Sequence, residues 1–281
     1  MENLNKLQQT LMILRNIYDD IRVINPISKR ILFDKDYNSI NEGYCYEFSG
    51  NEGPCSNCVG MRAFNEGRSF IKLYFNGEDI VLHTAMPFVM GEEKYIIEAY
   101  KVMDDTSFID GIEFNCKEDL KQYVENINNA AIRDEKTEVF NSRFAHERLP
   151  AEIELSKTSN ACISIALLEI KFAHEYENEN VRDYNIFNII SIVANELDKR
   201  TDWISRIEEN KFIILIKREN DNLCSEDYMR IIMELERKST LYNGTNFMLG
   251  ILVNQRVLSD MVYDAKQLIE YIMKNVKRTY E

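Results

Sequence analysis

Three of the chain's six cysteines lie close together in one loop, with a spacing that suits metal chemistry. Cys45, Cys55 and Cys58 form a Cys-x9-Cys-x2-Cys array within a segment that also contains glycine and proline. A Cys-x2-Cys loop brings two thiolates to one ion, which suits tetrahedral zinc or an iron–sulfur cluster, and the third cysteine is close enough to join. For the fourth ligand, His83 is the first candidate and Cys116 the second. A ligand from outside the chain could also complete the shell.

Two other interpretations of the cysteine loop stay open at this point. A reversible disulfide between Cys55 and Cys58 would make the loop a redox switch, since structural disulfides are rare in the cytosol. Free cysteines are also frequently buried as small hydrophobic residues. The spacing alone therefore leaves metal binding, redox chemistry and simple packing as alternatives.

The segments around the cysteines predict a small antiparallel sheet. Two β-rich runs, 21–26 and 28–33, flank an Asn-Pro turn, and three more strands are predicted over 69–75, 80–89 and 95–103, with hairpin turns between them. Helical and irregular segments, which hold the cysteines, separate the two groups. This order resembles a PAS domain, and the loop resembles a subgroup of PAS domains with Cys-Tyr-x-x-Phe before Pro-Cys-x-x-Cys. The resemblance implies a sensory role but no particular ligand.

A second resemblance covers about half of the chain. Residues 134–144 resemble the opening segment of GGDEF domains, Asp-x-Leu-Thr-x-Leu-x-Asn-Arg-Arg, and Glu208-Glu209-Asn210-Lys211-Phe212 occupies the place of the Gly-Gly-Asp-Glu-Phe signature of diguanylate cyclases. The elements between and after these motifs follow the family's order. They are a helix with Leu149, Ile153 and Leu155, a strand over 162–170, a helix around 186–197, a late strand over 247–251 and a closing helix over 260–278.

The signature positions lack the residues that cyclase chemistry needs. In the family, two glycines let a nucleotide approach the backbone, and the following carboxylates hold divalent metal against a triphosphate. Here the glycines are replaced by Glu208 and Glu209, and Asn210 replaces the key carboxylate, with Lys211 after it. Glu169, in the slot of the first metal-binding aspartate, could still bind magnesium. Two glutamates where phosphate should pass oppose GTP binding, so we expect no cyclase activity.

The remaining functional slots of the family are also changed. They hold Lys171 in the second acidic slot, Glu177-Asn178 where the guanine edge would bind, and Ile186-Phe187 in place of a Gly-Asp pair. Lys199-Arg200-Thr201-Asp202 falls where the product-binding Arg-x-x-Asp motif would lie. Lys199 loses the planar fork of arginine, although Arg200 is adjacent. A cyclic di-GMP or GTP effector that uses Lys199, Arg200 and Asp202 is therefore the alternative function.

Two segments show the spacing of a coiled-coil seam. The seam residues are Leu4, Leu7, Leu11, Leu14 and Tyr18 in the first segment and Leu120, Val124, Ile127 and Ala131 in the second. The second segment directly precedes the GGDEF-like half, where PAS-linked output domains carry a signalling helix. We expect a homodimer through these helices. Because each seam spans only about two heptads, the alternative is that each helix packs on its own domain.

Composition narrows the class of protein. A formal charge of −13 and an isoelectric point near 4.9 argue against binding nucleic acid or anionic membranes, which needs clusters of Lys and Arg. No apolar stretch approaches the roughly 18 to 20 residues that span a bilayer, and the start of the chain lacks a secretory apolar region. We expect a cytoplasmic protein.

These inferences combine into one prediction of fold and function. The fold is α+β or α/β, with an amphipathic helix over 1–18, a PAS-like antiparallel sheet with helices over 19–108, a helical linker over 109–133 and a GGDEF-like mixed sheet flanked by helices over 134–281. We expect a non-catalytic signalling protein, in which a change at the cysteine cluster alters how the sensor packs on the linker. The degenerate GGDEF half would then contact a protein partner.

Overall fold

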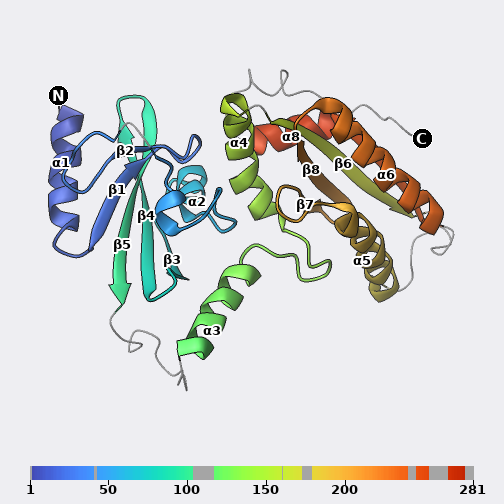
Figure 1. Cartoon of the computed structure of the whole chain (residues 1–281), viewed down its shortest axis with the longest axis horizontal. Coiled ribbons are helices and arrows are strands. Elements are labelled where there is room, and N and C mark those ends of the chain that lie inside the picture. The colour runs from blue at the N-terminus through green and yellow to red at the C-terminus, as the bar shows by residue number, and fades with distance from the viewer. Residues whose placement is uncertain are drawn as a thin grey trace. The chain divides into compact units, whose positions relative to one another are not determined.

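The computed structural model divides into two compact units, unit 1 (Met1–Ala131) and unit 2 (Ile132–Glu281), shown in Figure 1. The structure describes residues 2–40, 43–103, 117–159, 161–172, 179–239, 245–252 and 265–275. Among these residues, no helix combines the length and the apolar character needed to cross a bilayer.

Unit 1 contains the five predicted strands in one antiparallel sheet. Its strands are β1 (Asp20–Ile24), β2 (Ile31–Phe33), β3 (Phe70–Phe75), β4 (Ile80–Met90) and β5 (Glu93–Met103). Its helices are α1 (Glu2–Leu14), the short 3-10 helix η1 (Glu47–Ser49), α2 (Val59–Glu66) and α3 (Lys117–Ala130). The sheet order is β2-β1-β5-β4-β3, and all pairs are antiparallel. The prediction of an antiparallel sheet with helices is confirmed.

The two faces of this sheet differ in character. Helix α1 covers an apolar face, where Leu7 and Leu11 pack with a cluster formed by Ile21, Val23, Ile97 and Ala99. The opposite face is apolar only near α2, whose Val59 and Ala63 pack against Ile24, Ala85 and Ile96. Because side chains alternate along a strand, the second face also receives the neighbouring residues, which are charged or polar. They are Arg22, Lys72, His83, Glu98 and Tyr100.

Four of the described seam residues are buried inside unit 1. Leu7 and Leu11 pack on the sheet, and Leu120 and Val124 of α3 pack in a cluster with residues of β3 and β4. Ile127, in contrast, is 49% exposed. These leucines therefore follow the alternative in which each helix packs on its own domain. Homodimerisation stays a prediction, and it would use other faces of α1 and α3.

Unit 2 follows the predicted order of elements. Its strands are β6 (Cys162–Phe172), β7 (Trp203–Glu208), β8 (Lys211–Arg218) and β9 (Thr245–Leu252), and its described helices are α4 (Ser142–Thr158), α5 (Glu179–Glu196), α6 (Asp221–Ser239) and α8 (Ala265–Asn275). The sheet order is β7-β8-β6-β9.

Unit 2 has three layers, with α5 and α6 on one face of the sheet and α4 and α8 on the other (Figure 1). Along β6, Ala166, Leu168 and Ile170 face the first pair of helices, whereas Ile163, Ile165 and Leu167 face the second pair. Burial on both faces explains why this strand is apolar almost throughout. The layers place the hairpin of β7 and β8 at one edge of the sheet, with its turn at residues 209–210.

Candidate functional site

The four predicted metal ligands line one cavity in unit 1. The cavity has a volume of about 470 Å³ and lies on the polar face of the sheet, with walls from the cysteine loop, β3 to β5 and α3. Cys45, Cys55, Cys58 and His83 are all among its lining residues. Cys116, the other candidate ligand, lies outside the described residues. The structure therefore brings together residues that are up to 38 positions apart, from Cys45 to His83.

A lysine that the sequence analysis missed lies among these cysteines. Lys29 follows β1 in the turn toward β2, has a positive φ of 62°, and is only 1% exposed. Its ammonium donates a hydrogen bond to Cys58 Sγ at 3.4 Å, and its carbonyl accepts one from the Cys45 N–H at 2.8 Å. Among the described residues, no carboxylate oxygen lies within 4.0 Å of the Lys29 ammonium.

In this arrangement the predicted ligands do not fit a metal site. Within the described ranges, no three side chains of His, Cys, Asp or Glu are grouped so that they could hold a metal ion. The ammonium of Lys29 lies against Cys58, and a positive charge beside a ligand sulfur opposes a second cation. All three cysteines are free thiols. We therefore derive no step through zinc or an iron–sulfur cluster.

The thiols of the cysteine cluster give the Lys29 ammonium little negative charge, and the carboxylate of Glu98 attracts it only from more than 4.0 Å away. Burial raises the pKa of the Cys55 thiol, and raises that of Cys45 well above its ordinary value, so both are neutral at pH 7. For Lys29, burial acts to lower the pKa, and negative charge on Cys58, Cys45 and Cys55 would act to raise it, with a net rise. Because Cys45 and Cys55 are neutral, they cannot supply that charge.

A buried carboxylate completes the polar face. His83 Nε2 lies 3.4 Å from Glu98 Oε1, and Tyr100 donates a hydrogen bond to Glu98 Oε2 at 2.7 Å. Burial acts to raise the pKa of Glu98, but attraction to His83 and the hydrogen bond from Tyr100 outweigh it, so the pKa falls below its ordinary value. Burial lowers the pKa of His83. Gly60 of α2 fits against this carboxylate, since a Cβ there would lie 2.9 Å from Glu98 Oε1.

The cysteine loop is attached to helix α3 by hydrogen bonds. Asn57, between Cys55 and Cys58, donates through Nδ2 to Asn128 Oδ1 at 2.7 Å. Asn128 in turn donates to the carbonyls of Leu73 on β3 at 2.7 Å and Val124 at 2.9 Å. One side chain thus joins the cavity loop, the sheet and the helix that leads toward unit 2.

In unit 2, Arg206, which lies two residues before the signature pentad, links that pentad to the opening segment of the GGDEF resemblance. Arg206 Nη1 lies 2.9 Å from Asp134 Oδ1, and this oxygen also accepts hydrogen bonds from the N–H and hydroxyl of Thr137. Arg206 also donates to the Glu209 carbonyl from Nε at 3.1 Å and from Nη2 at 2.6 Å. The opening segment and the signature turn, 72 positions apart, therefore form one structural site.

The side chain of Asn210 is used inside the fold. Its Nδ2 donates to the Ile170 carbonyl at 2.9 Å, and the backbone carbonyl of Asn210 accepts a hydrogen bond from the Ile170 N–H at 2.9 Å. The residue in the key carboxylate position thus closes the turn onto β6. Glu169 is half-buried and pairs with Lys211 across the strands, and Phe212 is fully buried in the core.

The two glutamates that replace glycines are held by cations of the chain. Glu208 lies 2.6 Å from Lys211 Nζ, and Glu209 lies 2.5 Å from Arg182 of α5. The turn is therefore occupied by the chain's own ion pairs. Lys136 and Asp183 form another ion pair close by, at 2.7 Å.

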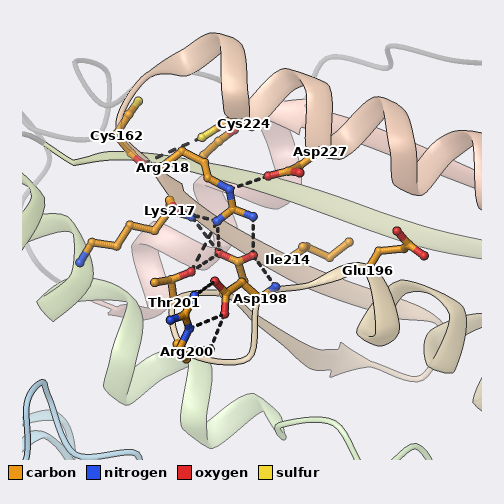
Figure 2. Close-up of polar contacts among 12 residues, drawn as sticks. Cys162, Glu196, Asp198, Arg200, Thr201, Ile214, Lys217, Arg218, Cys224 and Asp227 are labelled. Atoms are coloured by element: carbon orange, nitrogen blue, oxygen red, sulfur yellow. Dashed lines mark hydrogen bonds and ion pairs between the residues drawn. The ribbon is translucent and has the colours of Figure 1, made fainter.

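The segment Lys199–Asp202, predicted as an alternative nucleotide site, is only partly assembled. Lys199 and Asp202 line a cavity of about 490 Å³ in unit 2, but Arg200 is not among its lining residues. Arg200 instead pairs with Asp198 at 3.0 Å, as Figure 2 shows. The Asp202 side chain is 0% exposed, and its two oxygens accept from Arg218 at 2.7 and 2.8 Å. Asp202 therefore serves the fold and is not free for a ligand.

The remaining described positions singled out by the GGDEF resemblance do not join the signature turn. Ile186 is fully buried in the core on the α5 side, Phe187 lines the unit 2 cavity, and Lys171 is exposed. Glu177 and Asn178 lie outside the described residues. The described slots offer no second group of carboxylates to join Glu169.

No family model matches the chain, and no curated protein matches it. Among solved structures it is similar to the coiled coil and GGDEF domain of DgcB from Caulobacter crescentus in complex with c-di-GMP, with 12% identity, 57% of this chain and 85% of that chain covered, and a TM-score of 0.44. A sensory box/GGDEF family protein from the same organism is 15% identical over 52% of this chain and 95% of that chain, with a TM-score of 0.42. Diguanylate cyclase SiaD from Pseudomonas aeruginosa, in complex with its activator SiaC, is 16% identical over 56% of this chain and 66% of that chain, with a TM-score of 0.38.

Proposed function

We propose that the chain is a two-unit signalling protein in which unit 1 is a PAS-type sensor and unit 2 is a degenerate GGDEF domain. Unit 1 takes its signal at the cavity beside the cysteine loop. Unit 2 acts by contacting another protein and does not make cyclic di-GMP. The observation that carries this proposal is the closed signature turn, in which Asn210 is bound to β6 and Glu209 to Arg182.

The contact between Arg206 and Asp134 supports the relation to GGDEF domains. Arg206 contacts both Asp134, 72 residues earlier in the opening segment, and the Glu209 carbonyl in the signature pentad, so the fold links two short motifs that are each weak on their own. The order of helices and strands between them agrees with the same family. Unit 1 supports the PAS relation in the same way, because its two early strands and three late strands join in one sheet.

The chemistry of the turn supports a non-catalytic role. Two-metal phosphoryl transfer requires carboxylates that converge on the metals and a path for the triphosphate along the backbone. The turn offers one retained acid, Glu169, while Asn210 supplies an amide that is already hydrogen bonded. A triphosphate would also meet the carboxylates of Glu208 and Glu209, whose charge repels it.

The path of the signal follows the hydrogen bonds of Asn128. A ligand or a chemical change at Cys55 or Cys58 moves Asn57, which lies between them and binds Asn128. Because α3 ends at Ala130, directly before unit 2, a change in how α3 packs is passed along the chain. The two states would differ in whether the loop and α3 share this contact.

Calorimetry with GTP and with cyclic di-GMP tests the proposal and separates it from the effector alternative. With magnesium present, the full chain is expected to give no binding heat with either nucleotide. Heat with cyclic di-GMP that is lost in Lys199→Ala would favour the effector, and heat with GTP that is lost in Glu169→Ala would favour a cyclase. A variant with Glu208→Gly, Glu209→Gly and Asn210→Asp serves as the matched comparison for the turn.

A further inference from the structure

We propose that the cavity of unit 1 binds a small organic acid with one ionised carboxylate, and that Lys29 is its counter-ion. This deepens the sensory part of the proposed function, because it gives the chemical class of the signal. Nothing in it depends on unit 2.

The first observation is the state of the Lys29 side chain. It is 1% exposed and lines the cavity, and its one hydrogen-bond partner in the described structure is the Cys58 sulfur at 3.4 Å. An ammonium has three donors, and a buried charge without an opposite charge is strongly unfavourable. A weak sulfur acceptor satisfies one donor, so two remain for an acceptor in the cavity.

The second observation is a buried ring nitrogen on the same cavity. His83 is 6% exposed, and its Nε2 makes no hydrogen bond of good geometry in the structure, although Glu98 lies 3.4 Å away. Tyr100 already donates to that carboxylate. The Nε2 position therefore offers a second polar contact to a molecule in the cavity.

The charges inside the cavity set the charge of the ligand. Lys29 and Lys72 contribute two positive charges and Glu98 one negative charge, which leaves one positive charge. Glu125 also lines the cavity, but its side chain is exposed to solvent, where its charge is screened. A single carboxylate balances the interior, whereas a dianion would leave excess negative charge beside Glu98.

The size and the remaining donors favour an organic acid over an inorganic ion. A volume of about 470 Å³ falls in the range of cavities that hold small molecules. Ser49, Asn51 and Asn128 also line the cavity and can bind hydroxyl or amide groups of a ligand. A ligand bound there would lie beside Asn128, whose hydrogen bonds join the loop to α3.

Thermal unfolding of the full chain in sodium salts at constant ionic strength tests this inference. The probes are acetate, lactate and succinate, with phosphate and chloride as references. We expect acetate or lactate to raise the unfolding midpoint by roughly 3 °C or more over chloride, and succinate and phosphate to do less. Denatured protein is also analysed by mass spectrometry for an acid retained during purification.

Two substitutions make the test specific. Lys29→Met should abolish the shift, because it removes the ammonium that the acid binds. Lys101→Met, on the opposite face of the same sheet, should keep the full shift. Three results would each overturn the inference. The first is that no salt raises the unfolding midpoint above its value in chloride and no acid is retained, and the second is that Lys29→Met shows the same shift in midpoint as the unmodified chain. The third is a large loss of stability in both Lys29→Met and Cys58→Ser, which would make the Cys58 sulfur the counter-ion.

These outcomes are distinct from a failure of the proposed function. Cyclase activity or nucleotide binding would be detected in unit 2 whether or not an acid binds in unit 1. Conversely, loss of the acid site would leave the closed signature turn unchanged.

Discussion

Replacing Asn128 by alanine should loosen helix α3 without touching the cysteines or the core. The Asn128 side chain makes three hydrogen bonds, one from Asn57 and two to the carbonyls of Leu73 and Val124. In the variant, the Asn57 amide and the Leu73 carbonyl are left without this partner in a partly buried setting. The hydrophobic contacts of Leu120 with the sheet stay in place.

The size of the effect follows from these bonds. Each polar group left unsatisfied costs about 1 to 3 kcal/mol, and the gain in helix propensity from Asn to Ala returns about 0.6 kcal/mol. The net loss for opening α3 is then about 2 kcal/mol. Since about 1.4 kcal/mol is a factor of ten, the open population of α3 should rise roughly 30-fold.

Hydrogen exchange of backbone amides in 117–130, measured by mass spectrometry on the full chain, reports this opening directly. The matched control is Asn129→Ala, because the Asn129 side chain is exposed and makes no hydrogen bond within the described residues. The control gains helix propensity and loses no side-chain hydrogen bond, so hydrogen exchange of its α3 amides should be unchanged or slower than in the unmodified chain. Exchange of α3 in Asn128→Ala within about threefold of the unmodified chain would refute the proposed link.

Three further predictions concern the arginine ion pairs of unit 2, the buried carboxylate of Glu98 and the metal content of the chain. Arg206→Met should destabilise unit 2 by about 3 kcal/mol, because it removes a buried, hydrogen-bonded ion pair, whereas Arg200→Met, whose side chain is 88% exposed, should leave the free energy of unfolding almost unchanged. Urea unfolding followed by the chain's single tryptophan, which lies in unit 2, measures both, and equal losses would contradict the assignment. The pKa of Glu98 lies at about 2 in the folded protein, below its ordinary value, so the unfolded chain takes up the proton at a higher pH than the folded protein does. The ionised Glu98 therefore stabilises the folded state above about pH 4.5, and this contribution is lost as the pH falls toward 2. Exchange of β5 amides should therefore rise between pH 5 and 3, after correction for intrinsic rates, and Glu98→Gln should flatten that rise. Protein purified without oxygen should contain no zinc, iron or sulfide, and metal that is lost on Cys55→Ser and Cys58→Ser would establish the metal alternative.

Much of the fold follows from local patterns in the sequence. In unit 2, strands β6 and β8 are buried on both faces and are apolar over most of their length, so their type and place were predictable. The strands of unit 1 were equally predictable from the turns around Gly77 and Gly91, which both have positive φ. The signature hairpin also formed at the predicted residues, with Glu208 paired to Lys211.

The contents of the cavity were less accessible to sequence analysis. Lys29 lies in a turn after Pro26 and resembles a solvated surface lysine, and only the tertiary fold buries it. Glu98 carried a usable signal, because it is a carboxylate inside the apolar strand 95–100, at the same side as Tyr100. Asn57 and Asn128 carried none, since a hydrogen bond between a loop and a helix 71 positions away leaves no local pattern.

The metal prediction shows the same limit. The spacing of Cys55 and Cys58 can be read from a few residues of sequence. Whether their sulfurs bind a metal ion depends on which other side chains the fold places beside them. Here the fold brings an ammonium, 3.4 Å from Cys58. The sequence thus named residues that line one cavity, whereas the charge beside their sulfurs comes from a residue in a distant turn.

The most direct test of the central claim is turnover of GTP by the full chain. The protein is incubated with GTP and magnesium, and separately with manganese, and cyclic di-GMP is quantified by mass spectrometry against a reaction without protein. The closed turn predicts no product above that background, because Asn210 and Glu209 are engaged within the fold. Product that depends on Glu169 would contradict the account and make unit 2 an active diguanylate cyclase.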